Sequence, residues 1–182
     1  MAIPKGTEIP KSEGQFAKFQ DGVNRFRILS DIVTGWEGWK DKKPFRHEGQ
    51  VCRIKPEEVD LNQNGRPNIN YFWAMVVWNY AIKRVQVLEI TQKTVMSPLY
   101  DLEQNVEDWG DLKNYDIQIT KKKEGDKTNY SVIGIPPKPL IAEIKSAYEA
   151  SDVDLTKLFS GEYPMKEVKV EEGEVEDSEI PF

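Results

Sequence analysis

The sequence predicts a mainly β protein in which five strands form a small antiparallel barrel, with one helix between the third and fourth strands. An added C-terminal helix and a disordered acidic tail are expected to follow this barrel. Three observations support the prediction. Several stretches are dominated by β-branched and aromatic residues, and two segments carry apolar residues at spacings of three and four. The last twelve residues hold six acids and no base.

The chain begins with a segment that has no pattern of a packed element. Residues 1–20 are rich in Pro, Gly, Lys and Glu, so we expect a flexible N-terminal arm. The stretch RFRIL then predicts the first strand. Because side chains alternate along a strand, Phe26 and Ile28 should point to one face, and Arg25 and Arg27 to the other.

Five further segments complete the first half of the predicted fold. Residues 35–39, GWEGW, continue the first strand, and residues 44–51 can form a return strand. Residues 57–68 form a polar loop with an Asn-Gly turn. Residues 71–80 are the strongest strand, apolar on both faces, and residues 85–90 continue it or pair with it.

A helix is expected between this half and the last two strands, ending at Gly110. Its apolar stripe consists of Leu99, Leu102, Val106 and Trp109. Ser97 is suited to be its N-cap and Pro98 its first residue. A helix that begins at Thr91 and bends near Pro98 is the alternative.

Residues 115–120 and 130–135 predict two strands, with residues 121–129 as the hairpin loop between them. A second helix is expected over residues 140–150 after a run of prolines, followed by one short turn before Gly161. The predicted organisation is an arm (1–20), a barrel domain (21–137), a helical extension (138–160) and an acidic tail (161–182).

Three strands, a helix and two strands is the order of the five-stranded oligonucleotide-binding (OB) barrel, which binds nucleic acid across its second and third strands. Another small antiparallel barrel or a sandwich is the alternative from this order alone. The charge distribution is compatible with such binding. The formal net charge is −6, and the last twelve residues supply all of it, so the rest of the chain is neutral. A neutral body can still carry a basic groove, because the local field depends on where the charges lie.

Binding a single strand without reading its sequence requires cations along the phosphates and flat side chains on which bases stack. Trp36 and Trp39 are favoured as platforms because glycines and charges surround them. Trp73 and Trp78 should lie on opposite faces of one strand, so one belongs to the core and the other is a candidate platform. Tyr71 and Tyr80 add further flat surfaces. The candidate DNA-binding residues are Arg25, Arg27, Trp36, Trp39, Lys40, Lys42, Lys43, Phe45, Arg46, Arg53, Trp73, Trp78, Lys83, Arg84, Lys121, Lys122 and Lys123.

The acidic tail should be solvated and disordered, since it has too few apolar groups to offset the cost of ordering the chain. Its end is different, because an aromatic beside a proline and a free carboxylate can fill a small apolar pocket with a basic rim. This end resembles the C-terminal tip of bacterial and bacteriophage single-stranded DNA-binding proteins. Ser178 interrupts the paired acids of that tip. The matching residues are Asp177, Glu179, Ile180, Pro181 and Phe182.

Longer stretches resemble the phage branch of the same family, over most of residues 23–136: NRFRILS, the aromatic third strand, QVLEITQKTV and WGDLKNYDIQITKKKEG. The resemblance implies an OB barrel that coats and protects single-stranded DNA in replication, recombination and repair, in the cytoplasm of a bacterial or phage-infected cell. It also implies that the tip recruits partner enzymes (polymerase, helicase, primase, nuclease or recombinase) and competes with DNA for the groove. A homodimer is possible, and the helix at 140–150 is an addition to the minimal barrel.

Composition limits the other classes of protein. Cys52 and His47 are the only cysteine and histidine, so one chain can form neither an internal disulfide nor a His and Cys metal cluster. Some related phage proteins hold a structural zinc, whose ligands this chain lacks, and we expect no cofactor. No signal sequence or membrane span is expected, because the longest apolar run is shorter than the roughly 20 residues that cross a bilayer.

Two alternatives to DNA binding remain. A metal-dependent nuclease would need carboxylates that hold divalent ions. The candidates are Asp101, Glu103, Glu107, Asp108 and Asp111. They lie on or near the polar side of the expected helix, where charge is usually solvated, and no catalytic motif accompanies them, so we expect no enzymatic activity. The other alternative is an RNA-binding barrel, or an adaptor that uses the tail alone, since no pattern reveals recognition of the 2′-hydroxyl.

Overall fold

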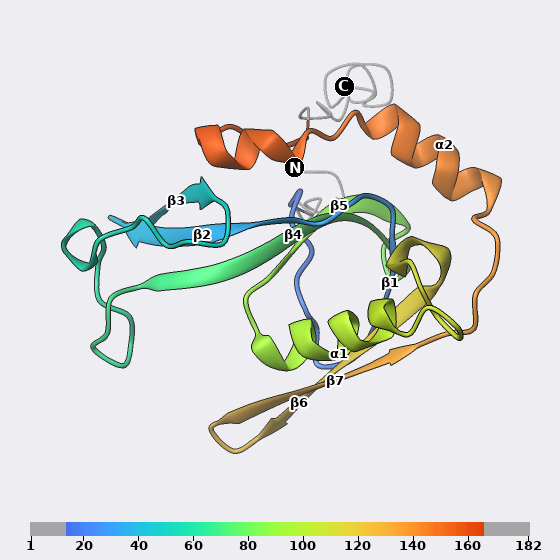
Figure 1. Cartoon of the computed structure of the whole chain (residues 1–182), viewed down its shortest axis with the longest axis horizontal. Helices are drawn as coiled ribbons and strands as arrows, with labels where there is room; N and C mark the ends of the chain where they lie inside the picture. The colour runs from blue at the N-terminus through green and yellow to red at the C-terminus, as the bar shows by residue number, and fades with distance from the viewer. Residues whose placement is uncertain (1–13, 166–182) are drawn as a thin grey trace, which may run out of the picture.

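The computed structural model describes residues 14–165, which form one antiparallel sheet of seven strands, two α-helices and three short 3-10 helices (Figure 1). The prediction of a mainly β fold is confirmed. In chain order the elements are β1 Gly22–Ile28, β2 Val33–Lys40, β3 Lys43–Glu48, η1 Pro56–Glu58, β4 Ile69–Asn79, β5 Arg84–Ile90, α1 Lys93–Gln104, η2 Leu112–Asn114, β6 Asp116–Glu124, β7 Lys127–Gly134, α2 Ala142–Ser151 and η3 Leu155–Ser160.

Strand β4 lies at the centre of the sheet and pairs with three others. One edge pairs with β2 along its first half and with β1 at its end, and the other edge pairs with β5. The strands run in the order β3-β2-β4-β1-β6-β7. Among the described residues no ladder joins β5 to β7, so the sheet is open. The predicted closed barrel of five strands is therefore wrong in closure and in strand count.

Hydrogen bonds between segments distant in the sequence explain both differences. The free edge of β5 is occupied by the end of the predicted arm, because Ala17 N–H donates to Val87 O and Val87 N–H to Gln15 O, each at 2.8 Å. Between β1 and β2 the Ser30 hydroxyl accepts from the backbone N–H of Val76 at 2.9 Å. This bond takes the place of a ladder bond, so the chain breaks there into two strands that share one edge of β4.

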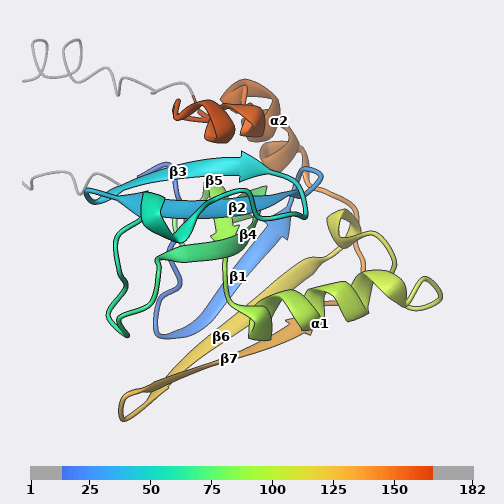
Figure 2. The same ribbon diagram turned by 60° about the vertical axis from the view of Figure 1, so that its left-hand side comes forward.

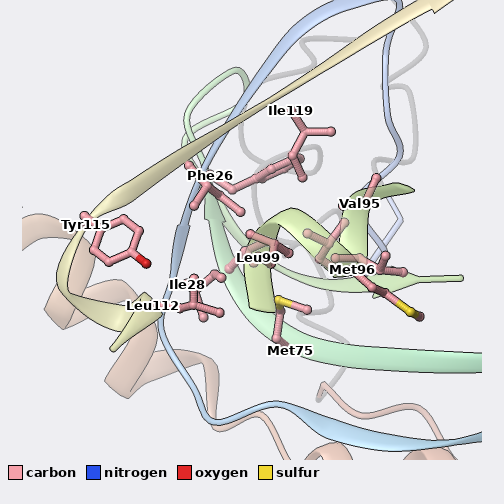
Figure 3. Close-up of a cluster of buried hydrophobic side chains, with 13 residues drawn as sticks. Phe26, Ile28, Met75, Val95, Met96, Leu99, Leu112, Tyr115 and Ile119 are labelled. Atoms are coloured by element: carbon pink, nitrogen blue, oxygen red, sulfur yellow. The ribbon is translucent and has the colours of Figure 1, made fainter. Parts of the chain in front are cut away.

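The sheet has a hydrophobic core on each face. The first core lies under α1, which packs between the sheet and the β6–β7 hairpin (Figures 1 and 3). The second lies under α2 and η3. Because side chains alternate along β4, Met75 and Val77 enter the first core, while Ala74, Val76 and Trp78 enter the second. The helical extension therefore covers one face of the central strands.

Helix α1 differs from the helix expected to end at Gly110. It begins at Lys93 and contains Pro98, which is close to the alternative of an earlier start. It ends at Gln104, and Val106 is 80 % exposed, so the expected apolar stripe does not extend to this residue. Trp109 instead packs edge-on against Tyr115, with 5.1 Å between ring centroids. No helix within residues 14–165 is long and apolar enough to cross a membrane.

The expected loop over residues 121–129 is much shorter in the structure. Strand β6 runs to Glu124, β7 begins at Lys127, and Gly125 makes the turn with a φ of 62°. A positive φ favours glycine, which explains the tight turn at this position. The lysines at 121–123 therefore belong to a strand, and alternation divides them between its two faces.

Candidate nucleic-acid interface

Five half-buried aromatic rings lie on one face of β2, β3 and β4. Trp36 pairs with His47 on one side and with Tyr71 on the other. Phe45 and Trp73 lie two residues from His47 and Tyr71, so they share this face. We call the side chains of Trp36, Phe45, His47, Tyr71 and Trp73 the aromatic face. All five are partly exposed to solvent.

Hydrogen bonds and close packing fix three rings of this face, those of Trp36, Tyr71 and Phe45. Trp36 Nε1–H donates to the backbone oxygen of Gln50 at 3.0 Å, and the Tyr71 hydroxyl donates to its Oε1 at 3.2 Å. The Trp36 and Tyr71 centroids are 5.3 Å apart. A Cβ on Gly38 would lie 2.7 Å from the Phe45 ring, so only glycine leaves room for that ring. Rings held in this way lose little further freedom when a ligand stacks on them.

Lysines of the β6–β7 hairpin lie on the same side of the sheet as the aromatic face. Tyr71 and Trp73 alternate into the first core, and so do Ile117 and Ile119 of β6. Continuing the alternation places Lys121 and Lys123 on that side. Figures 1 and 2 show the β2–β3 end of the sheet and the β6–β7 hairpin projecting from the same end of the molecule, with α1 between them.

Further cations lie at the end of β2 and in the following loop. Lys40 lies on the Trp36 side of its strand and pairs in register with Lys43, while Lys42 makes the turn with a φ of 63°. Within residues 14–165 none of these three lysines forms an ion pair. Arg53 is exposed and only touches Glu48 O at 3.5 Å. These cations are available to an anionic ligand.

Arg25 and Arg27 instead belong to a buried ion cluster around Asp116. Arg25 Nη2 lies 2.5 Å and Arg27 Nη1 3.4 Å from its carboxylate, and the Tyr80 hydroxyl donates to Oδ1 at 2.8 Å. Burial raises the pKa of Asp116, but hydrogen bonds from Arg25 and Tyr80 outweigh it and hold the pKa below its usual value. Burial and this same bond raise the pKa of Tyr80 to about 12. Arg27 is 3 % exposed, so its place among the candidate DNA-binding residues is corrected, whereas the Arg25 side chain stays 36 % exposed, on the face of β1 opposite to Phe26 and Ile28.

Arg46 and Trp39 lie on the opposite face of β2 and β3. Arg46 lies between two acidic side chains, with its Nε 3.0 Å from Glu37 Oε2 and its Nη2 2.8 Å from Glu89 Oε2. Trp39 Nε1–H donates to Glu37 Oε1 at 2.7 Å. Phe16 joins them to line a cavity of about 380 Å³. Trp36 and Trp39 are an odd number of residues apart, so the favoured pair does not form one platform.

The choice between Trp73 and Trp78 is settled by burial. Trp78 is only 5 % exposed and packs in the second core, so its place among the candidate DNA-binding residues is corrected. Trp73 is partly exposed on the aromatic face. Lys83 and Arg84 are at the far end of β4, about 26 Å or more from Tyr71 at roughly 3.3 Å per residue. Lys122 points to the other side of β6.

Besides Tyr71, which the sequence indicates only as a further flat surface, two aromatic residues of this region are outside the candidate set. His47 pairs with Trp36, and Tyr100 is 55 % exposed on α1. The pairing register of β2 and β3 reveals His47, and no signal in the sequence marks Tyr100. The five acids of the nuclease alternative are all exposed, on α1 or just after it. Within residues 14–165 no group of three His, Cys, Asp or Glu side chains could hold a metal ion.

The tip residues Asp177, Glu179, Ile180, Pro181 and Phe182 lie outside the described residues. Comparison of the chain with protein-family models, curated protein sequences and solved structures finds no match. The geometry of residues 14–165 therefore carries the functional argument.

Proposed function

We propose that the protein binds single-stranded DNA without sequence specificity, and that the DNA lies between the aromatic face and the lysines of the β6–β7 hairpin. The observation that carries the proposal is the aromatic face itself. Five partly exposed rings lie side by side on three strands, on the side of the sheet that Lys121 and Lys123 share. Tyr71 and Trp73 also pack against the first core, but all five rings keep part of their surface exposed to solvent.

The aromatic face can bind the bases of a single strand, and the lysines can bind its phosphates. Each stacked base contributes about 1–3 kcal/mol, and every base has a face to stack, so rings provide affinity without sequence preference. Lysine ammonium groups bind the phosphates and release condensed counterions. A duplex would not fit this use, because its bases are stacked on one another and their faces are not accessible.

The order of elements supports a finer assignment as an open relative of the OB barrel. If β1 and β2 are counted as one interrupted strand and β3 as an insertion, the remaining order is three strands, a helix and two strands. In that assignment β4 and β5 are the second and third strands of the barrel. Their usual binding face is partly covered by α2 and η3, so we place the DNA on the uncovered aromatic face of β2, β3 and β4.

Quenching of tryptophan fluorescence by oligo(dT), oligo(rU) and duplex DNA tests the proposal. We expect tight binding of oligo(dT), and weak binding of the duplex. Trp36→Ala should weaken oligo(dT) binding at least fivefold, from the loss of one stacked base. Trp39→Ala is the matched control on the opposite face and should change the affinity by less than about twofold. Equal affinity for duplex and oligo(dT) would contradict the proposal, and a preference for oligo(rU) would indicate an RNA-binding protein.

As part of the same proposal, the C-terminal tip recruits replication and recombination enzymes and competes with DNA for the lysines. Removing residues 171–182 takes away six acids, so the truncated protein should bind oligo(dT) more tightly at low salt. Phe182→Ala should keep the competition, which depends on charge, and lose the capture of partner enzymes, which depends on the aromatic end. Unchanged oligo(dT) affinity after truncation would rule out the competition.

A further inference from the structure

A small pocket at the edge of the aromatic face has the composition of a base-recognition site. It has a volume of about 200 Å³ and is lined by Trp73 of β4 and by Met96, Ser97, Tyr100 and Asp101 of α1. Ser97 and Asp101 are one helical turn apart, so their side chains lie together on the helix surface. Trp73 belongs both to the pocket and to the aromatic face, so a strand stacked on that face passes this opening.

The polar groups at this pocket lack protein partners. The Trp73 indole nitrogen is buried and has no hydrogen-bond acceptor among the described residues. Within residues 14–165 the side chains of Ser97, Tyr100 and Asp101 make no hydrogen bond or ion pair. A buried donor without an acceptor is costly, and a free carboxylate with an adjacent hydroxyl is able to bind a polar ligand.

We propose that this pocket takes one guanine of the bound strand, an inference that rests on the proposed function and adds a base preference to it. A carboxylate only accepts hydrogen bonds, and guanine alone offers two adjacent donors, N1–H and the N2 amino group, on its Watson–Crick edge. Adenine and cytosine place a ring acceptor beside their amino group, and thymine places a carbonyl on each side of N3–H. Asp101 therefore accepts from guanine in a bidentate manner, while Trp73 or Tyr100 stacks on its face.

The remaining groups of the pocket fit the same base. Guanine O6 needs a donor once its N1 and N2 groups are bound, and the Ser97 hydroxyl is a donor that lines this site. The charge of Asp101 repels phosphates, so it lowers affinity for a strand of thymines. The Asp101 carboxylate thus lowers the affinity for single-stranded DNA in general and raises it for a strand with guanine. A residue with only a structural role would not have these two opposite effects.

Competition binding with the full-length protein tests the pocket. The probes are an oligo(dT), the same oligonucleotide with one central deoxyguanosine, and a third with deoxyinosine, which keeps N1–H and lacks the N2 amino group. We expect the guanine probe to bind about fivefold more tightly than oligo(dT), the low end for a bidentate contact, with inosine between them. Asp101→Asn should abolish the guanine preference and at the same time tighten binding of oligo(dT).

Glu103→Gln is the matched control, because it removes the same charge from α1 at a residue that does not line the pocket. It should retain the full guanine preference. Equal binding of the guanine and thymine probes, or a preference that survives Asp101→Asn or is lost in Glu103→Gln, would overturn the guanine pocket. Failure to bind any of the probes would instead overturn the proposed DNA-binding function itself.

Discussion

Replacing Glu89 by glutamine should stabilise the protein at alkaline pH and change its stability least at acid pH. Glu89 and Glu37 share a single cation, because Arg46 Nη2 lies 2.8 Å from Glu89 and 3.0 Å from Glu37. Burial, together with the nearby Glu37, raises the pKa of Glu89 from 4.5 to about 8. Near neutral pH the folded protein therefore holds a proton on this side chain.

The sign of the pH dependence follows from this proton. Between pH 4.5 and about 8 the folded protein keeps the proton on Glu89 and the unfolded chain does not. The stability that Glu89 contributes is therefore complete below the pKa of Glu89 in the unfolded chain. It is lost as the pH rises toward the pKa of Glu89 in the folded protein. At about 1.4 kcal/mol per unit the full shift corresponds to roughly 4–5 kcal/mol. Since Glu37 shares the titration, we expect the change in the free energy of unfolding to be about 1–3 kcal/mol.

Urea unfolding of the wild type and of Glu89→Gln at pH 5, 7 and 9, followed by tryptophan fluorescence, measures this effect. Glutamine resembles the protonated acid, so the two proteins should differ least at pH 5 and most at pH 9. Glu107→Gln, an exposed acid after α1, is the control and should follow the wild type at every pH. If the stability of Glu89→Gln falls with pH as steeply as that of the wild type, the shared-cation argument is refuted.

Three further predictions concern the buried polar cluster and the sheet. Asp116→Asn leaves its buried arginine without a counter-ion and should lower the free energy of unfolding by about 3 kcal/mol in urea; a loss below about 1 kcal/mol would contradict this role. Gly35→Ala places a methyl group 3.0 Å from the Phe159 ring and against a backbone carbonyl, and should cost about 2–3 kcal/mol. A neutral effect would contradict the close approach of β3 and of the Phe159 ring to this glycine. Burial raises the pKa of Tyr80 and of Tyr115 to about 12 each, so an absorbance titration should show a late-ionising class, which Tyr80→Phe reduces.

The sequence predicts most elements of this fold because their patterns are local. Alternation in RFRIL and the β-branched run of β4 are properties of a few adjacent residues, and the structure has strands at both places. Barrel closure depends instead on which chain reaches the free edge of β5. No pattern in QFA, residues 15–17, indicates that this short segment pairs with Val87.

The site shows the same division between local and long-range information. Alternation alone places Trp36 and Trp39 on opposite faces, so that part of the correction was available from the sequence. The burial of Trp78 required the position of α2 and η3, which are more than 60 residues away in the sequence. The neutralisation of Arg25 and Arg27 required the β1–β6 register, which sets both beside Asp116.

The salt dependence of oligo(dT) binding tests most directly whether DNA lies between the aromatic face and the β6–β7 hairpin. Strand β6 offers a matched control, because its three adjacent lysines point to different sides. Lys121 and Lys123 lie on the side of the aromatic face and Lys122 on the other side. Replacing the first two by glutamine should make the slope of log affinity against log salt shallower by about 1.4, from two lost phosphate contacts at roughly 0.7 each. Lys122→Gln should leave the slope unchanged. An unchanged slope in the double variant, or an equal change per lysine in Lys122→Gln, would contradict the proposed path of the DNA.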